Sequence, residues 1–152
     1  MERKICWQWK DFNDLSLVEL HAILLLRAQV FVVEQNCVYQ DPDIDDLHSR
    51  HLLGKDGDEI VAYIRIIRPS KCAKLKIGRV VVARTYRQYG LGKKAIKLGV
   101  EHCKKQFPMT NIYISAQVYL LAFYKELGFV TLGDIYDEDG IDHINMVYAK
   151  DK

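Results

Sequence analysis

A short segment with two glycines and flanking basic residues offers the clearest binding chemistry in the sequence. Residues 87–93 read Arg-Gln-Tyr-Gly-Leu-Gly-Lys, so that one residue separates Gly90 from Gly92. Glycines let main-chain N–H groups approach a ligand closely, and a helix that begins here would add unpaired N–H groups and the positive end of its dipole. Arg87 and Lys93 add positive charge on both sides. The segment therefore predicts a phosphate-binding loop.

Two common nucleotide-binding motifs fit this loop poorly. Residues 90–95 satisfy the dinucleotide fingerprint G-x-G-x-x-G/A, but six residues separate the preceding strand from Gly90, and no carboxylate lies near position 115. A Walker-type loop requires Ser or Thr after its lysine, whereas Lys94 follows Lys93. Taken alone, the two glycines would also fit a simple turn.

Acidic and cysteine residues give weaker indications of metal chemistry. Residues 41–45 begin like a calcium loop, but its sixth position holds Asp46 in place of glycine and its twelfth holds Leu52 in place of glutamate. We interpret this acidic run as a solvated loop or as the rim of a site for a cationic acceptor. The four cysteines lie more than 30 residues apart, which disfavours zinc sites and disulfides. Free, mostly buried thiols and no bound metal are expected.

Hydrophobic periodicity places the glycine loop between a central strand and an amphipathic helix. Residues 76–83 are β-branched and apolar on both faces, as in a strand covered on both sides. Residues 91–107 carry apolar side chains at helical spacing with lysines on the other side, and Pro108 ends this helix. Residues 112–116 predict another strand, and residues 120–127 predict a short helix that Gly128 ends.

The remaining segments predict one more helix and two hairpins. A capping box formed by Ser16 and Glu19 begins a helix that extends to about Val33 and leads into an acidic loop at 36–50. Asp-Gly pairs at 56–57 and 139–140 mark the two hairpin turns. Further strands are expected at 4–9, 51–55, 59–68, around 129–136 and at 143–149. This order predicts an α/β fold of the mixed α+β kind, with a central mixed sheet and helices on both faces.

Composition and charge limit the class of protein. The 152 residues, 49% of them hydrophobic, fit one domain spanning 1–152. No apolar run is long enough to span a bilayer and the start of the chain is polar, so a soluble, cytoplasmic protein without a membrane partner is expected. Residues 65–105 hold thirteen basic residues and one acidic residue, although the net charge is only +2. A polyanionic ligand could bind this part, whereas a duplex-binding protein would more often be basic overall.

Two motifs and the N-terminal segment resemble one family. Residues 80–92 resemble the acyl-CoA loop of the GNAT superfamily of N-acyltransferases, whose signature is Arg/Gln-x-x-Gly-x-Gly/Ala after a central strand. Residues 116–129, which include Phe123-Tyr124 and Gly128-Phe129, are similar to a second family motif at the expected distance. Residues 30–41 are similar to the bacterial ElaA-like branch, so the resemblance covers nearly the full length.

This resemblance implies a GNAT-type fold with a mostly antiparallel sheet, and acetyl-CoA as the acyl donor. The main chain of Val80, Val81 and Val82 would lie beside the pantetheine arm, and one of these amides would polarise the thioester carbonyl. Gln117 stands where the family usually has an Asn that bonds the pantetheine chain. The pyrophosphate would be held by the loop, namely by Arg87, Gln88, Tyr89, Gly90, Leu91, Gly92 and Lys93.

The resemblance also implies a general acid. Tyr124 falls at the family's general-acid position, where a phenol can donate a proton as the C–S bond breaks. Many members place Glu on the central strand, but this chain has Arg79 in that region, which leaves the base unassigned. Glu34 and His143 are candidates for the base or for binding the substrate, directly or through water.

The expected function is therefore an acetyl-CoA-dependent N-acetyltransferase, in which a primary amine attacks the donor directly in a ternary complex. The alternative is a non-catalytic acyl-CoA-binding or regulatory module, and a nucleic-acid-binding protein fits the sequence less well. The acceptor is expected to be an amine of a small molecule or peptide, and the resemblance leaves a homodimer open.

Overall fold

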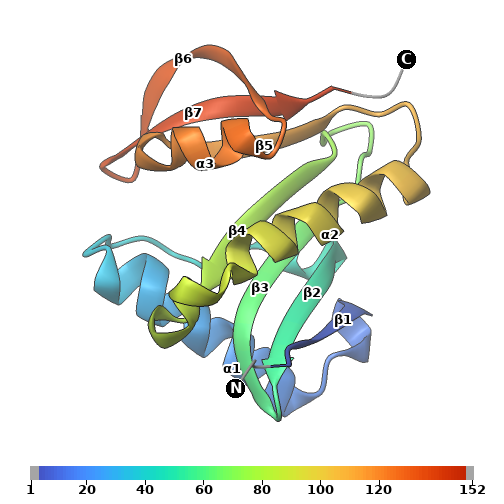
Figure 1. The fold of residues 1–152 in the computed structure, drawn as a ribbon, viewed down its shortest axis with the longest axis vertical. Helices are drawn as coiled ribbons and strands as arrows, with labels where there is room; N and C mark the ends of the chain where they lie inside the picture. Colours follow the sequence, from blue (N-terminus) through green and yellow to red (C-terminus); the bar gives the residue numbers. More distant parts are fainter. Residues whose placement is uncertain (1–3, 150–152) are drawn as a thin grey trace.

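Seven strands form one sheet in the computed structural model, which describes residues 4–149 (Figure 1). Their order across the sheet is β1-β2-β3-β4-β5-β7-β6, and every neighbouring pair is antiparallel except β4 and β5. This arrangement confirms the predicted mixed, mostly antiparallel sheet. The strands are β1 (Cys6–Asp11), β2 (Ser49–Asp56), β3 (Glu59–Ile67), β4 (Lys76–Val82), β5 (Ile112–Gln117), β6 (Val130–Glu138) and β7 (Ile141–Tyr148).

The helices begin close to the predicted positions. The capping box at the start of the first helix is present, because the Ser16 hydroxyl accepts from the Glu19 N–H and the Glu19 carboxylate accepts from the Ser16 N–H. None of the helices within residues 4–149 is long and apolar enough to cross a membrane. The α-helices are α1 (Leu17–Arg27), α2 (Leu91–Gln106) and α3 (Leu121–Glu126), and short helical segments are η1 (Phe12–Asp14), η2 (Ala28–Glu34), η3 (Ile44–His48), η4 (Arg84–Tyr89) and η5 (Val118–Leu120).

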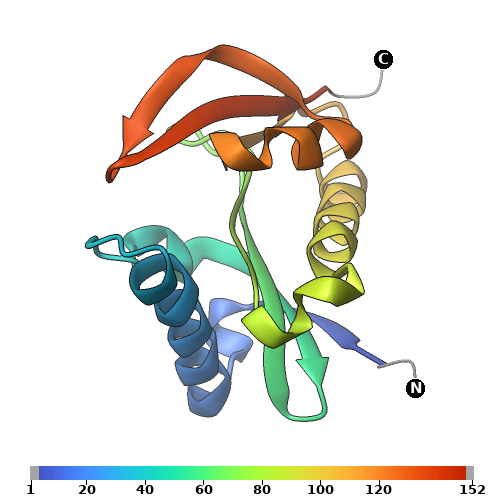
Figure 2. The same ribbon diagram turned by 60° about the vertical axis from the view of Figure 1, so that its left-hand side comes forward.

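The helices cover both faces of the sheet, as expected. Because side chains alternate along a strand, Leu53 and Tyr63 pack in one core with α1, whereas Leu52 and Ile64 pack in the other with α2. Figure 2 shows α1 and α2 on opposite sides of β3 and β4. The core that contains α2 also includes Tyr124 of α3, so α2 and α3 share one face.

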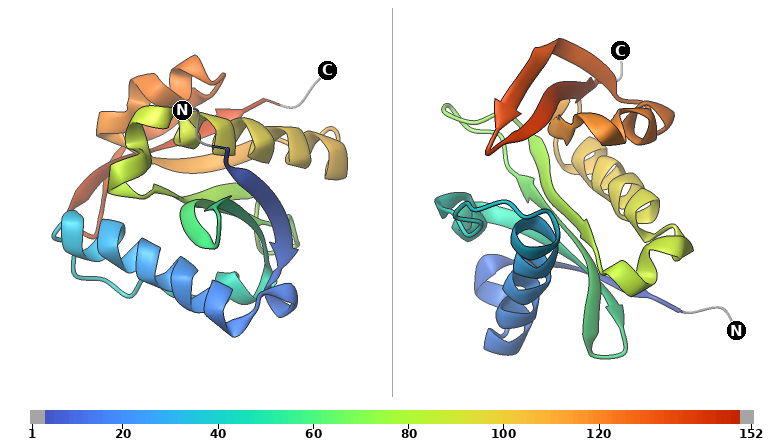
Figure 3. Two further views of the ribbon diagram at one scale, coloured as in Figure 1. Left: turned by 60° about the horizontal axis from the view of Figure 1, so that its bottom comes forward. Right: turned by 90° about the vertical axis from the view of Figure 1, so that its left-hand side faces the viewer.

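Strands β4 and β5 pair only at their beginning and then diverge. Among the described residues, their register contains the single pair Lys76–Tyr113. Beyond it, β5 continues with β7 and β6, and these three strands lie apart from β1–β4 (Figure 3). One edge of β4 is therefore left without a neighbouring strand just before the glycine loop begins.

Three local predictions were wrong in detail. The helix expected to reach Val33 is α-helical only to Arg27 and continues as the π-helix η2. The acidic segment 36–50 contains η3 and the first residues of β2, because Asp43 and Asp46 form a capping box and Ser49 already pairs with Ile67. The first strand begins at Cys6 rather than at residue 4. Periodicity does not distinguish α- from π-helix, nor does it reveal strand partners.

Candidate active site

The glycine loop leads directly into the first turn of α2. Gly90 adopts the left-handed conformation, with φ +69° and ψ 23°, and precedes Leu91, the first helical residue. The N–H of Lys94 donates to the Gly90 carbonyl. The three preceding N–H groups, those of Leu91, Gly92 and Lys93, therefore lie before the first intrahelical bond and are free to bind an anion.

Gly92 lies where α2, β4 and α3 come together. A Cβ atom at this position would be 3.6 Å from Val82 Cγ2 and 3.7 Å from Phe123 Cζ. Both are ordinary contact distances, so an alanine would fit here. The start of α2 therefore lies beside the side chains of Val82, at the end of β4, and Phe123, on α3.

A β-bulge interrupts β4 just before this region. Tyr63 faces Val81 and Arg65 faces Gly78, so Arg79 and Val80 together lie opposite Ile64. Arg79 has φ +51°, a left-handed conformation that costs a non-glycine residue on the order of 1–3 kcal/mol. Such a conformation persists only where the surrounding structure holds it in place.

The pairing pattern orients the main chain of β4. The Ala83 N–H donates to the Val61 carbonyl at 2.8 Å, which means that this N–H faces β3. Because N–H directions alternate along a strand, the Val81 N–H also faces β3, whereas those of Val80 and Val82 face the side from which β5 diverges. The Val81 side chain is buried beneath α1. Of the three predicted donor-binding valines, Val80 and Val82 thus present main-chain groups to this side.

Tyr124 lies on α3, next in sequence to Phe123. Its side chain is only 4% exposed, and its ring makes edge contacts with Phe123 at 5.1 Å and Phe129 at 6.0 Å between centroids. Burial raises the pKa of Tyr124 above its ordinary value of about 10. Its hydroxyl is therefore protonated at neutral pH and able to donate.

Both basic side chains of the loop have carboxylate partners. Arg87 forms a two-pronged ion pair with Glu34, with Nη2 2.6 Å from Oε2, and its Nε donates to the Val82 carbonyl at 3.3 Å. Hydrogen bonding to Arg87 lowers the pKa of Glu34, which makes this carboxylate a weak base. Lys93 lies 3.4 Å from Glu126. The intervening Gln88 and Tyr89 are exposed.

Gln117 ends β5 and pairs with a residue that the sequence analysis did not identify. Its amide and that of Gln35 donate to each other, at 3.1 and 3.2 Å. Nearby, the Cys37 thiol donates to the Asp139 carbonyl at 3.3 Å. These contacts join the segment after α1 to the half of the sheet formed by β5, β7 and β6. Gln35 and Gln117 are 82 positions apart, so no local pattern could have indicated the pair.

His143 lies across the strand register from Gln117. Its side chain is buried, and Nδ1 donates to the Ile141 carbonyl at 2.7 Å. The other nitrogen, Nε2, lies 3.2 Å from a Glu138 carboxylate oxygen. The hydrogen bond to Ile141 thus orients the ring near the tip of the β6–β7 hairpin.

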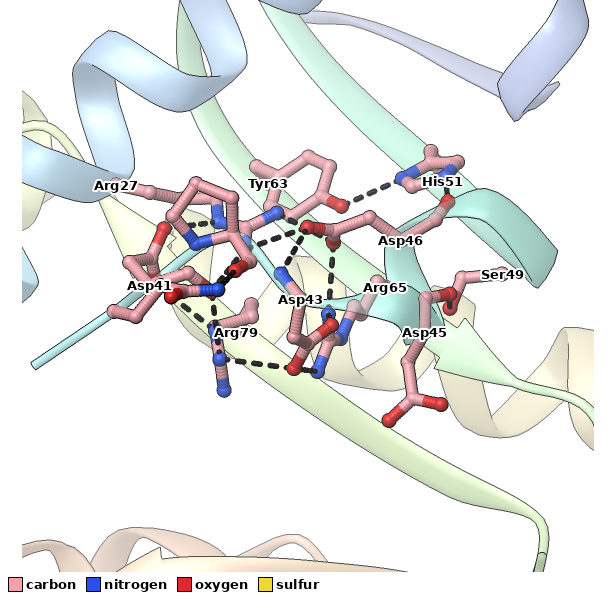
Figure 4. A network of polar contacts seen from close by, with 12 residues as sticks. Arg27, Asp41, Asp43, Asp45, Asp46, Ser49, His51, Tyr63, Arg65 and Arg79 are labelled. Carbon is pink, nitrogen blue, oxygen red and sulfur yellow. Dashed lines mark hydrogen bonds and ion pairs between the residues drawn. The ribbon is translucent and has the colours of Figure 1, made fainter.

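The acidic run at 41–46 was predicted to be a solvated loop or a rim for a cationic acceptor, and this was wrong for its main members. Asp41 and Asp46 are 4% and 7% exposed. Together with Asp43 they form ion pairs with arginines from α1, β3 and β4 (Figure 4). We call this set the arginine–aspartate network; its members are Arg27, Asp41, Asp43, Asp46, Arg65 and Arg79. Two arginines of the basic middle, Arg65 and Arg79, therefore have local counter-ions.

The cysteines divide evenly between core and surface. Cys37 and Cys103 are buried, but Cys6 and Cys72 are exposed, so the expectation of mostly buried thiols was wrong for half of them. Burial raises the pKa of Cys103 to about 12 and also raises that of Cys37. Both buried thiols are therefore poor nucleophiles at neutral pH. Within residues 4–149, no cluster of three or more His, Cys, Asp or Glu side chains is arranged to hold a metal ion.

The two glycines of the loop are expected to respond differently to alanine. Gly90→Ala should destabilise the fold by about 1 kcal/mol, because a side chain disfavours the left-handed conformation. Gly92→Ala, the matched control, should fold with unchanged or slightly increased stability, because its Cβ makes ordinary contacts inside a helix. Urea denaturation of both variants measures the difference. Equal stability of the two would contradict this account of the turn.

Comparisons with known proteins agree with this geometry. The family model "Acetyltransferase (GNAT) domain" matches residues 25–150. ElaA from Escherichia coli K12 is 43% identical over 143 residues, which is 92% of this chain and 94% of that protein. The crystal structure of E. coli ElaA has a TM-score of 0.88 at 42% identity, covering 95% of this chain and 99% of that one. A crystal structure of an acyl-CoA N-acyltransferase from Pseudomonas aeruginosa has a TM-score of 0.89 at 39% identity, covering 96% and 100%.

Proposed function

The chain belongs to the GNAT family of acetyltransferases and is an acyltransferase, and from this premise we propose that it transfers an acetyl group from acetyl-CoA to a primary amine. The similarity to ElaA confirms the branch that the sequence resembles. The amine is proposed to attack the donor directly, while donor and acceptor are both bound.

The convergence of three elements carries this proposal. The N–H groups at the start of α2, the end of β4 and Phe123 of α3, the helix that also carries Tyr124, lie together around Gly92. A long ligand with a phosphate group at one end and a thioester at the other matches these hydrogen-bond donors, taken in order from α2 to β4 and α3. The P. aeruginosa relative, described as an acyl-CoA N-acyltransferase, supports the same class of donor.

The residues present fit coenzyme A. Three main-chain N–H groups at the N-terminus of α2, together with the nearby Arg87 and Lys93, suit a pyrophosphate. Both the N-terminus of the helix and the two basic side chains supply positive charge. The outward N–H groups of Val80 and Val82 suit the amides and the thioester carbonyl of the extended arm. We propose that Gln117 contacts this arm after its amide separates from that of Gln35.

The reaction follows from these positions. The amine nitrogen forms a bond to the acetyl carbonyl carbon, and negative charge develops on the carbonyl oxygen. An N–H group of β4, proposed to be that of Val80, stabilises this charge, a type of contact that contributes about 3 kcal/mol. The C–S bond then breaks, and Tyr124 is proposed to give its proton to the leaving thiolate. The nitrogen loses one proton to solvent and solvent returns one to Tyr124, so that the N-substituted acetamide, the free thiol and the protonated phenol result.

The chemistry of the thiols favours direct transfer over an acetylated cysteine. Cys103 is buried among apolar residues, and its pKa is raised to about 12. The Cys37 thiol donates to the Asp139 carbonyl, and its pKa is raised as well. Neither is activated by a base as a catalytic thiol would be.

The acceptor is proposed to approach from the side of Glu34 and His143. Both residues lie near the contacts that join the two halves of the sheet, because Glu34 precedes Gln35 and His143 faces Gln117. Glu34 is tied to Arg87, so a donor phosphate on Arg87 would release its carboxylate. We propose that the released carboxylate attracts the ammonium form of the acceptor, which loses a proton to solvent before the neutral amine attacks.

Calorimetric titration with acetyl-CoA, followed by an assay of thiol release across a panel of amines, tests the proposed function. Binding and amine-dependent thiol release are expected. Failure of acetyl-CoA to bind at millimolar concentration would refute the proposal. Binding without transfer to any class of amine would favour a regulatory acyl-CoA-binding module.

Removing the negative charge of Glu34 should strengthen donor binding. Glu34→Gln frees Arg87 from its ion pair, and an exposed pair of this kind corresponds to an effect of up to about fivefold in affinity. Calorimetry with coenzyme A measures the change. Glu126→Gln is the control, because its contact with Lys93 is longer and should have less effect. Weaker binding by Glu34→Gln would mean that Glu34 orients Arg87 for the phosphate rather than competing with it.

A further inference from the structure

The bulge in β4 is held from one side by the arginine–aspartate network. Arg79 Nε lies 2.9 Å from Asp41 Oδ1, and Nη2 donates to the Asp41 carbonyl at 2.9 Å and to Asp43 Oδ2 at 3.2 Å. The guanidinium also lies over the Tyr39 ring, 5.8 Å from its centroid. Four contacts thus fix the side chain of the residue that has the positive φ. Figure 4 shows the contacts of Arg79 with Asp41 and Asp43, which join the 41–46 loop to β4.

The loop that holds Arg79 is itself anchored in the core. Arg27 Nε and Nη1 lie 2.8 Å from Asp41 and Asp46, and Arg65 Nη1 lies 2.7 Å from Asp46. Arg27 and Arg65 are almost fully buried. Three arginines face three aspartates, so the network carries no net charge, and Arg79 has no surplus charge to offer a phosphate.

The bulge decides which way the end of β4 faces. Ile77 packs on the α2 side, and strict alternation from Ile77 would place residue 79 there as well. The extra residue instead turns the Arg79 side chain to the α1 side, next to Arg65, and brings Val80 to the α2 side. The N–H of Val80, the second residue of the bulge, faces the side from which β5 diverges.

We infer that Arg79 is a positioning residue for acyl transfer: its side chain, clamped by Asp41 and Asp43, fixes the bulge that aims the Val80 N–H at the thioester carbonyl. This inference rests on the proposed function. The pyrophosphate loop has a separate anchor, since the Tyr86 hydroxyl donates to Asp56 at 2.7 Å and Leu91 packs in its own small core. Arg79 therefore acts on the reacting carbonyl and not on the affinity for the nucleotide end of the donor.

Kinetics and calorimetry of Arg79→Met and Arg79→Lys test this inference. Arg79→Met should lower kcat at saturating acetyl-CoA by about 100-fold, as expected when an oxyanion donor is misaligned. Its Kd for coenzyme A, which has no thioester, should stay within about twofold of wild type. Arg79→Lys should recover part of the loss, because an ammonium can pair with Asp41 but cannot span all the contacts. Asp45→Asn is the matched control, since Asp45 belongs to the same loop and points away from the arginines in Figure 4.

An amide spectrum distinguishes failure of this inference from failure of the proposed function. The Val80 amide resonance should shift in Arg79→Met and Arg79→Lys, while those of Gly90 and Gly92 stay in place. Wild-type protein without acetyl transfer would refute the proposed function, and the spectrum would still report whether Arg79 fixes the bulge. Any one of three results would overturn the inference: unchanged kcat in a folded Arg79→Met variant, an unmoved Val80 resonance, or a loss of coenzyme A affinity as large as the loss of kcat. If Arg79→Met does not fold, full activity of Arg79→Lys would overturn the inference.

Discussion

Tyr124→Phe is expected to lower kcat for acetyl transfer by about 100-fold and to leave the affinity for acetyl-CoA nearly unchanged. The ring is held by edge contacts with Phe123 and Phe129, and phenylalanine preserves both, so only the hydroxyl is lost. Burial raises the Tyr124 pKa, which keeps the proton in place through the neutral range and makes it available to a departing thiolate. Steady-state kinetics with the best amine of the panel measure the loss.

The pH dependence gives this prediction a second readout. A group with a raised pKa stays protonated to higher pH, so wild-type kcat should not fall through loss of the Tyr124 proton below pH 10, tyrosine's ordinary value. Tyr119→Phe is the control, because Tyr119 belongs to the preceding turn and is exposed. Normal turnover by Tyr124→Phe at every pH would remove the general-acid role and leave acetyl transfer itself standing.

Asp46→Asn should destabilise the fold by about 3 kcal/mol at pH 7, the range measured when one partner of a buried ion pair is removed. Asp46 lies 2.8 Å from Arg27 Nη1 and 2.7 Å from Arg65 Nη1, and both guanidinium groups are almost fully buried. Asparagine keeps the size of the side chain but removes the charge that balances them. Urea unfolding monitored by fluorescence measures the loss, and Asp45→Asn should differ from wild type by less than about 0.5 kcal/mol.

Acid should reduce this difference. Hydrogen bonds and charge from Arg27 and Arg65 outweigh burial and lower the pKa of Asp46 to about 2, below its ordinary value of 3.8. A carboxyl group whose pKa is lowered in the folded state stabilises the fold at pH values above its ordinary pKa. This stabilisation, about 2 kcal/mol here, is lost as the pH falls toward the folded-state pKa. At pH 3 roughly half of that contribution should remain. A gap between Asp46→Asn and wild type that is as large at pH 3 as at pH 7 would contradict this account.

The sequence predicted the elements whose signals are local. The helix expected at 91–107 is α2, Leu91–Gln106, because its apolar spacing and Pro108 lie within the segment itself. The second hairpin turn was equally readable, since Asp139 and Gly140 both have positive φ, as an Asp-Gly turn requires. In the glycine loop, Gly90 likewise has a positive φ, which its residue type permits.

Features that depend on distant partners were not readable. Asp46 pairs with Arg27 and Arg65, each 19 positions away, and nothing next to Asp46 distinguishes it from a solvated aspartate. The bulge at Arg79 arises from the register with β3, which periodicity does not give. For the candidate site, motifs indicated the loop and Tyr124, but they could not show that Glu34 pairs with Arg87, 53 positions away.

The contacts that tie the residues after η2 to the far half of the sheet are uncharged. The paired amides of Gln35 and Gln117, and the Cys37 thiol on the Asp139 carbonyl, hold by neutral hydrogen bonds, which dissolved ions scarcely screen. Attraction of a polyanion to Arg87 and Lys93 is screened strongly. Rising ionic strength should therefore increase KM for the donor, while the spacing of the two halves in the protein without donor stays constant.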